Sequence, residues 1–200
     1  MTAKMYAKGT QTRESILLTA ARLFDKKGAF GTSIDDIARE LGIAKGTLYQ
    51  YFASKEDLIV KTIIWSEGIL LARLAAIGEN GPTDVETAMF EIAKASFAHF
   101  REYGDFIALF LSVPSEITEE YRENGYPFSR IVGTFDDQLR KRCTGFSAEL
   151  AHWELGTLAF MNLEAYRIDA RGGGCDERNF DADIHRRIKF FAHGILQRRD

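Results

Sequence analysis

The chain has 200 residues, of which 46% are hydrophobic and only three are proline, enough for one compact helical protein or two small domains with a substantial core. This composition excludes a disordered chain, and the scarcity of alternating β-branched runs, beside pervasive helical periodicity, predicts an all-α fold. The net charge of −3 divides into +4 over residues 1–55 and −7 over residues 56–200, so the overall acidity does not exclude contact between the basic segment and nucleic acid.

The first ten residues, MTAKMYAKGT, carry Lys4 and Lys8 without an apolar run. This pattern excludes a secretory signal and leaves room for a flexible arm that touches phosphate. No later segment approaches the ~18 unbroken apolar residues of a membrane span. We therefore expect a soluble, cytoplasmic protein with no membrane partner.

Residues 34–41 have the periodicity of a short amphipathic helix. Ile34, Ile37, Ala38 and Leu41 fall at positions i, i+3, i+4 and i+7 and share one face. Thr32 and Ser33, followed by Asp35 and Asp36, form an acidic variant of a capping box at its start. Gly42 suits the left-handed residue that ends such a helix.

A second short helix follows after only residues 42–44. A turn this short that contains glycine makes two helices cross steeply. Leu48 and Phe52 are four residues apart and anchor the second helix to a core. The other faces carry residues that suit a DNA groove, because they offer an ammonium group, hydroxyls, an amide and aromatic rings: Lys45, Gly46, Thr47, Tyr49, Gln50 and Tyr51.

Ser54 and Asp57 then mark the start of a long helix, expected over residues 55–77. Lys55 lies in its first turn, where a cation opposes the helix macrodipole and contributes little to folding. Lys55 is therefore a candidate phosphate contact. The alternative is a solvated surface charge.

The block of residues 12–58 resembles the N-terminal domain of the TetR family of one-component regulators. The resemblance is carried by TRESILLTAARLFDKKGAFGTS, IDDIARELGIAKG and TLYQYFASKEDL, and it covers roughly a quarter of the chain. Ala44 departs from the pattern, since relatives often carry a Ser that caps the second helix, and a missing cap typically costs ~1 kcal/mol.

The resemblance implies DNA contacts at Ser33, Lys45, Gly46, Thr47, Tyr49, Gln50, Tyr51 and Lys55. It places Tyr49 and Tyr51 against the DNA backbone, and residues 45–47 and 50 nearest the bases. Two alternatives remain: the tyrosines pack half-buried within the domain, and Gly46 is a tolerated helical glycine rather than a point of close approach.

Beyond residue 58 the pattern stays helical. Thr83 and Glu86 suit the cap of a helix that reaches residue 103, and Pro114 should split the helical segment over residues 105–121. Further helices are expected over residues 126–142, 147–168 and 181–198, giving about nine in all. We assign residues 1–55 to a DNA-binding domain with its arm, and residues 56–200 to a ligand-binding and dimerisation domain, with the boundary inside the long helix.

Twelve of the fifteen phenylalanines lie beyond residue 82. Aromatic residues of this region are candidates to line a cavity for an apolar ligand: Phe97, Phe100, Phe106, Phe110, Phe128, Phe135, Trp153 and Phe160. Aromatic residues at helical spacing also form ordinary cores, so that alternative stays open.

The last two expected helices carry apolar faces that include small residues. The resemblance implies that they pair with a second copy as a four-helix dimer interface, and exposed apolar terminal helices need a partner. The candidate interface residues are Leu150, Gly156, Ala159, Leu163, Ile184, Ile188, Phe191 and Ile195. The alternative is packing within one subunit.

These features together predict a homodimeric DNA-binding regulator, a repressor of a palindromic operator that is released by a small apolar or aromatic molecule. One alternative is a DNA-binding protein without an inducer. Another is a helical enzyme, but the sequence has no HExxH, GxSxG or Walker motif, and His99, His152, His185 and His193 are isolated. We expect no catalytic residues, cofactor or metal, and Cys143 and Cys175, which lack zinc or disulfide spacing, should be reduced thiols.

Overall fold

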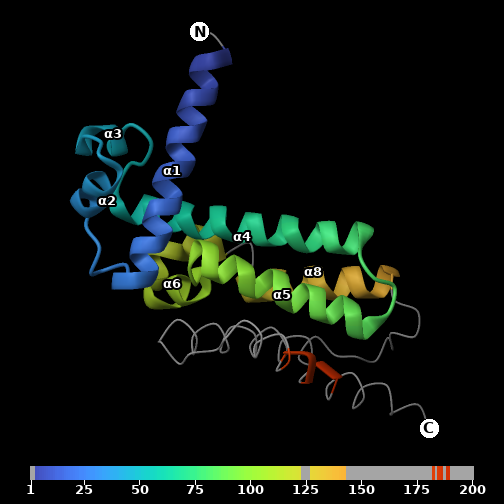
Figure 1. Ribbon diagram of the computed structural model, residues 1–200. Coiled ribbons are helices and arrows are strands. Elements are labelled where there is room, and N and C mark those ends of the chain that lie inside the picture. The colour runs from blue at the N-terminus through green and yellow to red at the C-terminus, as the bar shows by residue number, and fades with distance from the viewer. Residues whose placement is uncertain (1–2, 123–126, 143–181, 183, 187, 190–200) are drawn as a thin grey trace. The chain divides into compact units, whose positions relative to one another are not determined.

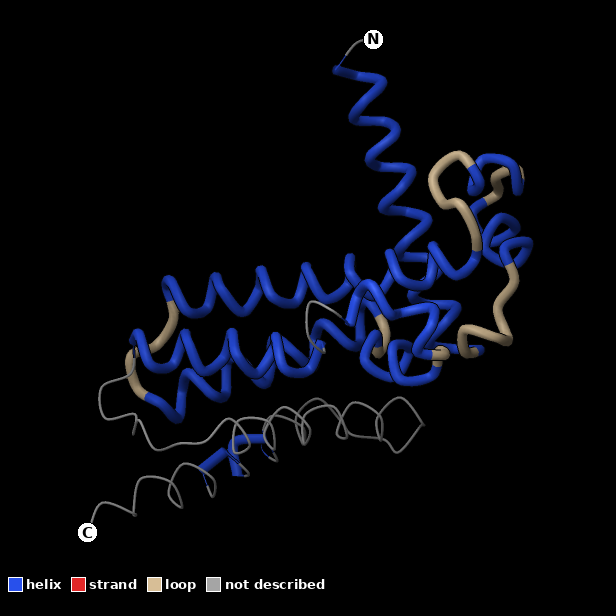
Figure 2. Tube along the Cα trace, turned by 180° about the vertical axis from the view of Figure 1, so that it is seen from behind, coloured by secondary structure: helices blue, strands red, loops and turns tan. Residues whose placement is uncertain are grey.

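The structure is a computed structural model that describes residues 3–122, 127–142, 182, 184–186 and 188–189. Every regular element within these ranges is helical, which confirms the predicted all-α fold (Figures 1 and 2). The elements are α1 (Ala3–Lys27), α2 (Ile34–Leu41), α3 (Lys45–Tyr49), α4 (Lys55–Asn80), α5 (Val85–Tyr103), α6 (Phe106–Ser112), the 3-10 helix η1 (Ser115–Thr118), α7 (Glu119–Arg122) and α8 (Pro127–Arg142). The helix expected over residues 147–168 lies outside the described residues.

The chain forms two compact units. The first comprises residues 1–68 and 103–125, and the second comprises residues 69–102 and 126–200. Helix α4 is continuous from Lys55 to Asn80 and therefore contributes to both units, three residues longer than expected.

In the first unit, α1 packs against α2 and α6, and α2 packs against α3. Ile16, Leu17 and Phe24 of α1 are buried together with Ile37 of α2 and Leu58 of α4. Residues 3–10, for which the sequence left room for a flexible arm, continue α1 as a helix. The physical reason is composition, because this stretch has several good helix formers and no proline to stop the helix.

The loop between α1 and α2 is held by a buried hydroxyl. Gly28 adopts the left-handed conformation (φ 75°) that ends a helix without a Cβ penalty. The Thr32 hydroxyl donates to the carbonyl oxygens of Leu23 at 3.1 Å and Gly28 at 2.9 Å. The chain therefore enters α2 from a defined direction.

Two long-range polar contacts tie residues 103–122 to the rest of the first unit. The backbone N–H of Asp105 donates to Asp25 Oδ1 at 2.9 Å, beside Gly104, which has φ 79° and where a Cβ would lie 2.8 Å from the Cβ of Asp25. The hydroxyl of Tyr121 donates to the buried Glu67 carboxylate on α4.

The proline break expected in residues 105–121 is confirmed. Helix α6 ends at Ser112, and Val113 is extended (φ −100°, ψ 148°), as residues before proline prefer. Pro114 then precedes η1. Three short helical elements replace one long one.

In the second unit, the C-terminal part of α4 lies beside α5 and α8 (Figures 1 and 2). Arg73 of α4 forms an ion pair of 2.6 Å with Glu102 of α5. The predicted cap of α5 by Thr83 and Glu86 is wrong by one residue: α5 begins at Val85, so the capping position is Asp84, whose Oδ1 accepts from Thr87 N at 2.8 Å. This hydrogen bond from the Thr87 backbone lowers the pKa of Asp84.

Candidate DNA-binding site

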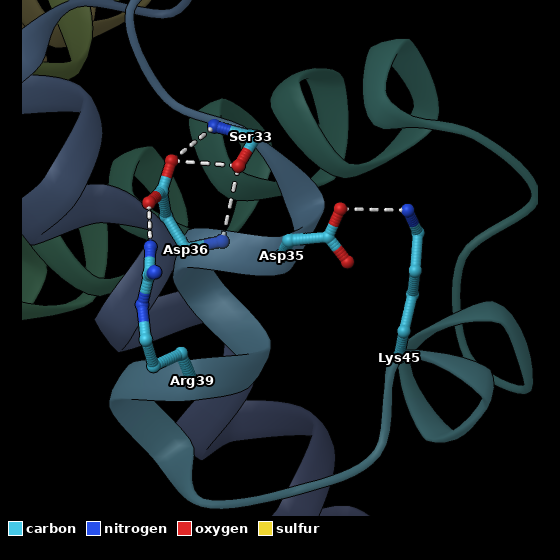
Figure 3. A network of polar contacts seen from close by, with 5 residues as sticks. All are labelled: Ser33, Asp35, Asp36, Arg39 and Lys45. Atoms are coloured by element: carbon cyan, nitrogen blue, oxygen red, sulfur yellow. Dashed lines mark hydrogen bonds and ion pairs between the residues drawn. The ribbon is translucent and has the colours of Figure 1, made fainter.

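Helix α2 begins with the capping box that its sequence predicts. The Ser33 hydroxyl accepts from Asp36 N at 3.1 Å, and the Asp36 carboxylate accepts from Ser33 N at 3.0 Å (Figure 3). The hydrogen bond from the Ser33 side chain is the main reason why the pKa of Asp36 is lowered to about 2. Arg39 also pairs with Asp36. The start of α2 is thus fixed by residues within six positions of one another.

Gly42 ends α2 in the left-handed conformation (φ 64°), and only Ile43 and Ala44 follow before α3. Ala44 occupies the capping position of α3 without a side-chain hydrogen bond, as its departure from the family pattern implied. Leu48 and Phe52 are buried, at 1% and 2% exposure, and anchor α3 and the turn after it. In α2, Ile34, Ile37 and Ala38 are buried as expected, whereas Leu41 in the last turn is only half-buried.

The anchored side of α3 leaves the opposite side open to solvent. Ser33, Lys45, Gly46, Tyr49 and Gln50 are exposed, and Thr47, Tyr51 and Lys55 are half-buried. Tyr49 is 50% exposed, which is high for an aromatic side chain. The ring centroid of Tyr51 lies 6.5 Å from that of Phe52, so Tyr51 packs partly on the domain.

Gly46 is not required by the fold. A Cβ built at this position meets no atom within 4 Å, and the residue does not have a positive φ. A glycine in a helix costs roughly 0.5–1 kcal/mol relative to alanine. The protein thus carries a small local cost at the centre of an exposed helix face.

Lys45 is paired across the turn. Its Nζ lies 2.8 Å from Asp35 Oδ2, and both side chains remain open to water, at 49% and 64% exposure (Figure 3). The hydrogen bond that Lys45 donates to Asp35 raises the pKa of Lys45, so the ammonium group stays charged at neutral pH. Asp35 therefore belongs to the candidate site. The sequence does not predict this role, because a separation of ten residues across a turn matches no helical pairing rule.

Helix α4 follows α3 closely in the sequence and has its own N-terminal cap. Asp57 N donates to Ser54 Oγ at 3.1 Å, and Asp57 Oδ2 accepts from Ala53 N at 2.8 Å, so the predicted Ser54 cap is confirmed. Lys55 Nζ lies 6.0 Å from the ring centroid of Phe30. Phe30 is 69% exposed, and its ring lies beside the Lys55 ammonium group. The sequence does not reveal this contact, because the two residues are far apart along the chain.

The other candidate residues are distributed between the two units. Phe106 and Phe110 are buried in the first unit, and Phe97 and Phe100 are buried in the second. Phe128 and Phe135 lie on α8, and Trp153 and Phe160 lie outside the described residues. A hollow of about 600 Å³ is lined by α4 residues and by Glu116, Ile117 and Tyr121, and none of the candidate aromatic residues borders it.

Of the interface candidates, only Ile184 and Ile188 lie within the described residues, and both are buried within the single chain, at 3% and 0% exposure. Their side chains pack inside the protomer. Leu150, Gly156, Ala159, Leu163, Phe191 and Ile195 lie outside the described residues.

His99 is fully buried, and burial, assisted by Arg73, lowers its pKa to about 3, so it stays neutral. His99 is thus a packed residue of the second unit. His185 lies 3.9 Å from Phe90, measured between ring centroids. Among the described residues, no three acidic, histidine or cysteine side chains come together as a metal site, and no helix is long and apolar enough to cross a membrane.

Comparison with known proteins identifies the domain that carries this surface. Residues 16–62 match the family model of bacterial regulatory proteins, tetR family. The chain is 38% identical over 132 residues to the uncharacterized HTH-type transcriptional regulator YerO of Bacillus subtilis (strain 168), an alignment that covers 65% of this chain and 45% of YerO. The chain thus spans less than half the length of that relative.

Solved structures share the fold. The fatty acid degradation regulator FadR from Bacillus halodurans has a TM-score of 0.68 at 16% identity, over 88% of this chain and 93% of that chain. FadR from Bacillus subtilis, in complex with stearoyl-CoA, has a TM-score of 0.67 at 14% identity, over 88% and 96%. These relatives are regulators and not enzymes, in agreement with the expected class. Residues 16–62 therefore resemble the N-terminal domain of the tetR family of bacterial regulatory proteins, and YerO, named as an HTH-type transcriptional regulator, is similar over 132 residues.

Proposed function

We propose that this protein is a transcriptional repressor that binds a palindromic operator as a homodimer and releases it when a small apolar or aromatic molecule binds. The DNA-binding domain is residues 1–55, and residues 56–200 bind the ligand and the second copy. A protein that reads chromosomal DNA acts in the cytoplasm. The exposed face of α3, held between two capped helices, is the observation that supports the proposal best.

The chemistry of that face matches the DNA major groove. Gln50 and Thr47 offer an amide and a hydroxyl to base edges, and Lys45 offers an ammonium group. Tyr49, Tyr51, Ser33 and Lys55 supply hydroxyls and a cation to phosphates. At Gly46 the missing side chain lets the backbone approach DNA closely.

The modest charge of one domain supports homodimerisation. Residues 1–55 carry a net charge of only +4, so a single domain neutralises few phosphates. Two copies that present their α3 helices about 34 Å apart would read successive major grooves, and the operator would then be an inverted repeat.

Ligand release requires a link between the two domains. Helix α4 begins in the first unit, which contains the DNA-binding domain, and continues without a break into the second unit. A ligand that prefers a dimer with a different spacing of its DNA-binding domains weakens DNA binding in proportion to that preference, and about 5.5 kcal/mol of differential affinity converts a 1:99 equilibrium into 99:1. The complex of the fold neighbour FadR with stearoyl-CoA supports an effector with a large apolar part.

The first test is selection of random duplex DNA by the purified protein at near-physiological salt, followed by sequencing of the retained DNA. An enriched inverted repeat is expected. A folded, dimeric protein that enriches no sequence would overturn the proposal. Ligands can then be screened by release of the protein from the selected operator.

Two variants separate base reading from phosphate contact. Gln50→Ala should relax the preference at one position of each half-site by about 1–3 kcal/mol, and equal losses on operator and random DNA would contradict the role of Gln50. Lys55→Ala should weaken binding to all sequences and lower the salt slope by about one. Lys189→Ala removes the same charge from an exposed position of the second unit and should leave the slope unchanged.

A further inference from the structure

We infer that Asp35 is a positioning residue that determines DNA specificity: its carboxylate holds the Lys45 ammonium group in one place and balances its charge, so that Lys45 serves base reading at the operator and adds little to binding of other DNA. This inference rests on the proposed function of the α3 surface. It assigns a role to an acidic residue that the family resemblance does not include among the DNA contacts.

The pair joins the first turns of the two helices of the motif. Asp35 lies in the first turn of α2 and Lys45 is the first residue of α3, and their charged atoms are 2.8 Å apart (Figure 3). An ammonium group has three protons, and one hydrogen bond to Asp35 leaves two for other acceptors. Because the Lys45 side chain is 49% exposed, those two protons remain available to acceptors outside the domain, such as DNA.

The fold does not need Asp35 for the cap of α2. That task belongs to Ser33 and Asp36, and Arg39 pairs with Asp36 and not with Asp35. The Asp35 side chain is 64% exposed. Without this carboxylate, the surface around it would attract phosphate more strongly. A carboxylate at that place weakens general attraction to DNA, and its contact with Lys45 is the feature that offsets this cost.

The Asp35–Lys45 pair affects both counterion release and the loss of side-chain freedom when DNA binds. An unpaired lysine that neutralises a phosphate releases a counterion and adds about 0.9 to the salt slope on any duplex. A lysine that already has an internal counterion adds less. A free lysine side chain also loses rotamer freedom when it binds, whereas Lys45 held by Asp35 has already lost part of it.

The experiment compares the wild-type protein with Asp35→Asn, which keeps the size of the side chain and removes its charge. Affinities for the selected operator and for random duplex DNA are measured across a range of salt concentrations. We expect tighter binding of Asp35→Asn to random DNA with a slope steeper by about 0.9, and a ratio of operator to random affinity that falls at least about threefold. An unchanged ratio would overturn the inference.

Three further variants make the result specific to the pair. Glu40→Gln removes one exposed carboxylate from the same helix without touching Lys45, and it should shift both affinities together. Asp35→Glu keeps the carboxylate and should keep the ratio near that of the wild-type protein. In a Lys45→Met background, Asp35→Asn should no longer change the ratio, and a persistent change would show that Asp35 acts without Lys45.

The outcomes also separate this inference from the proposed function. If the wild-type protein enriches no operator, the proposed function fails and this inference fails with it. If the wild-type protein enriches an operator but Asp35→Asn behaves like Glu40→Gln, this inference alone is overturned. Thermal melting of each variant establishes that the domain is folded in every comparison.

Discussion

The helix-turn-helix segment and the remainder of the first unit are held by polar contacts of different kinds. In residues 33–57 the contacts join residues three to ten positions apart and are mostly exposed to water. In the remainder, Asp25 meets Asp105 across 80 positions, and Glu67 meets Tyr121 across 54 positions in a buried setting. The short-range contacts fix the helix ends and one exposed ion pair of the helix-turn-helix, whereas the long-range contacts join segments far apart in the sequence.

The largest effect is expected for a variant of Leu48, which tests whether the helix-turn-helix also depends on buried apolar side chains. Leu48 is 1% exposed, so Leu48→Ala should lower the free energy of unfolding by about 2–5 kcal/mol through lost burial and a cavity. Chemical denaturation of both proteins measures the loss. A loss below 1 kcal/mol would mean that α3 is not anchored by Leu48, and the exposed face of α3 would lose its support.

Tyr121→Phe tests the buried long-range contact in the remainder of the unit. Removing the hydroxyl takes one donor from the Glu67 carboxylate, which is buried, and should destabilise the protein by about 1–2 kcal/mol. DNA affinity, measured well below the melting temperature, should not change. A variant of full stability would show that this buried contact does not stabilise the first unit.

Ser33→Ala tests the short-range cap of α2. The Ser33 hydroxyl accepts from Asp36 N, and loss of such a cap should cost about 1 kcal/mol of unfolding free energy. Ser33→Asp, which can also cap, is the matched control and should retain most of that stability. Equal losses in both variants would mean that the hydroxyl is not acting as a cap.

Gly46→Ala separates folding from binding at a single position. Because a Cβ here meets no atom within 4 Å, the variant should be more stable than the wild-type protein, by up to about 1 kcal/mol. Close approach of the backbone to DNA predicts weaker operator binding in the same variant. Increased stability with unchanged operator binding would leave Gly46 as a tolerated helical glycine.

The smallest expected effect is the pH dependence of the α2 cap. The pKa of Asp36 is lowered from 3.8 to about 2 in the folded protein, so the unfolded chain takes up this proton first as the solution is acidified. Its contribution to stability is complete above about pH 4 and is lost as the pH falls toward 2. Melting temperatures of the wild-type protein and Asp36→Asn, measured between pH 6 and about pH 2, should converge toward the acid end, and a constant difference would contradict this assignment.

Local rules of sequence predicted the helix-turn-helix in detail. The Ser33 cap, the left-handed Gly42, the short turn and the anchors Leu48 and Phe52 all depend on residues a few positions apart, and each is present as predicted. The same rules failed by one residue at α5, because Thr83 and Asp84 are both good caps and only the observed start of the helix at Val85 selects Asp84.

The sequence alone predicted the all-α class, the resemblance to the tetR family and the residues on the face of α3, because these depend on helical periodicity and on side-chain chemistry within short segments. Only the tertiary structure decided that Lys45 meets Asp35, that Phe30 lies beside Lys55, and that Tyr121 reaches the buried Glu67. These contacts cross turns or join distant helices, and no spacing rule relates such positions, since their distances depend on how the helices pack.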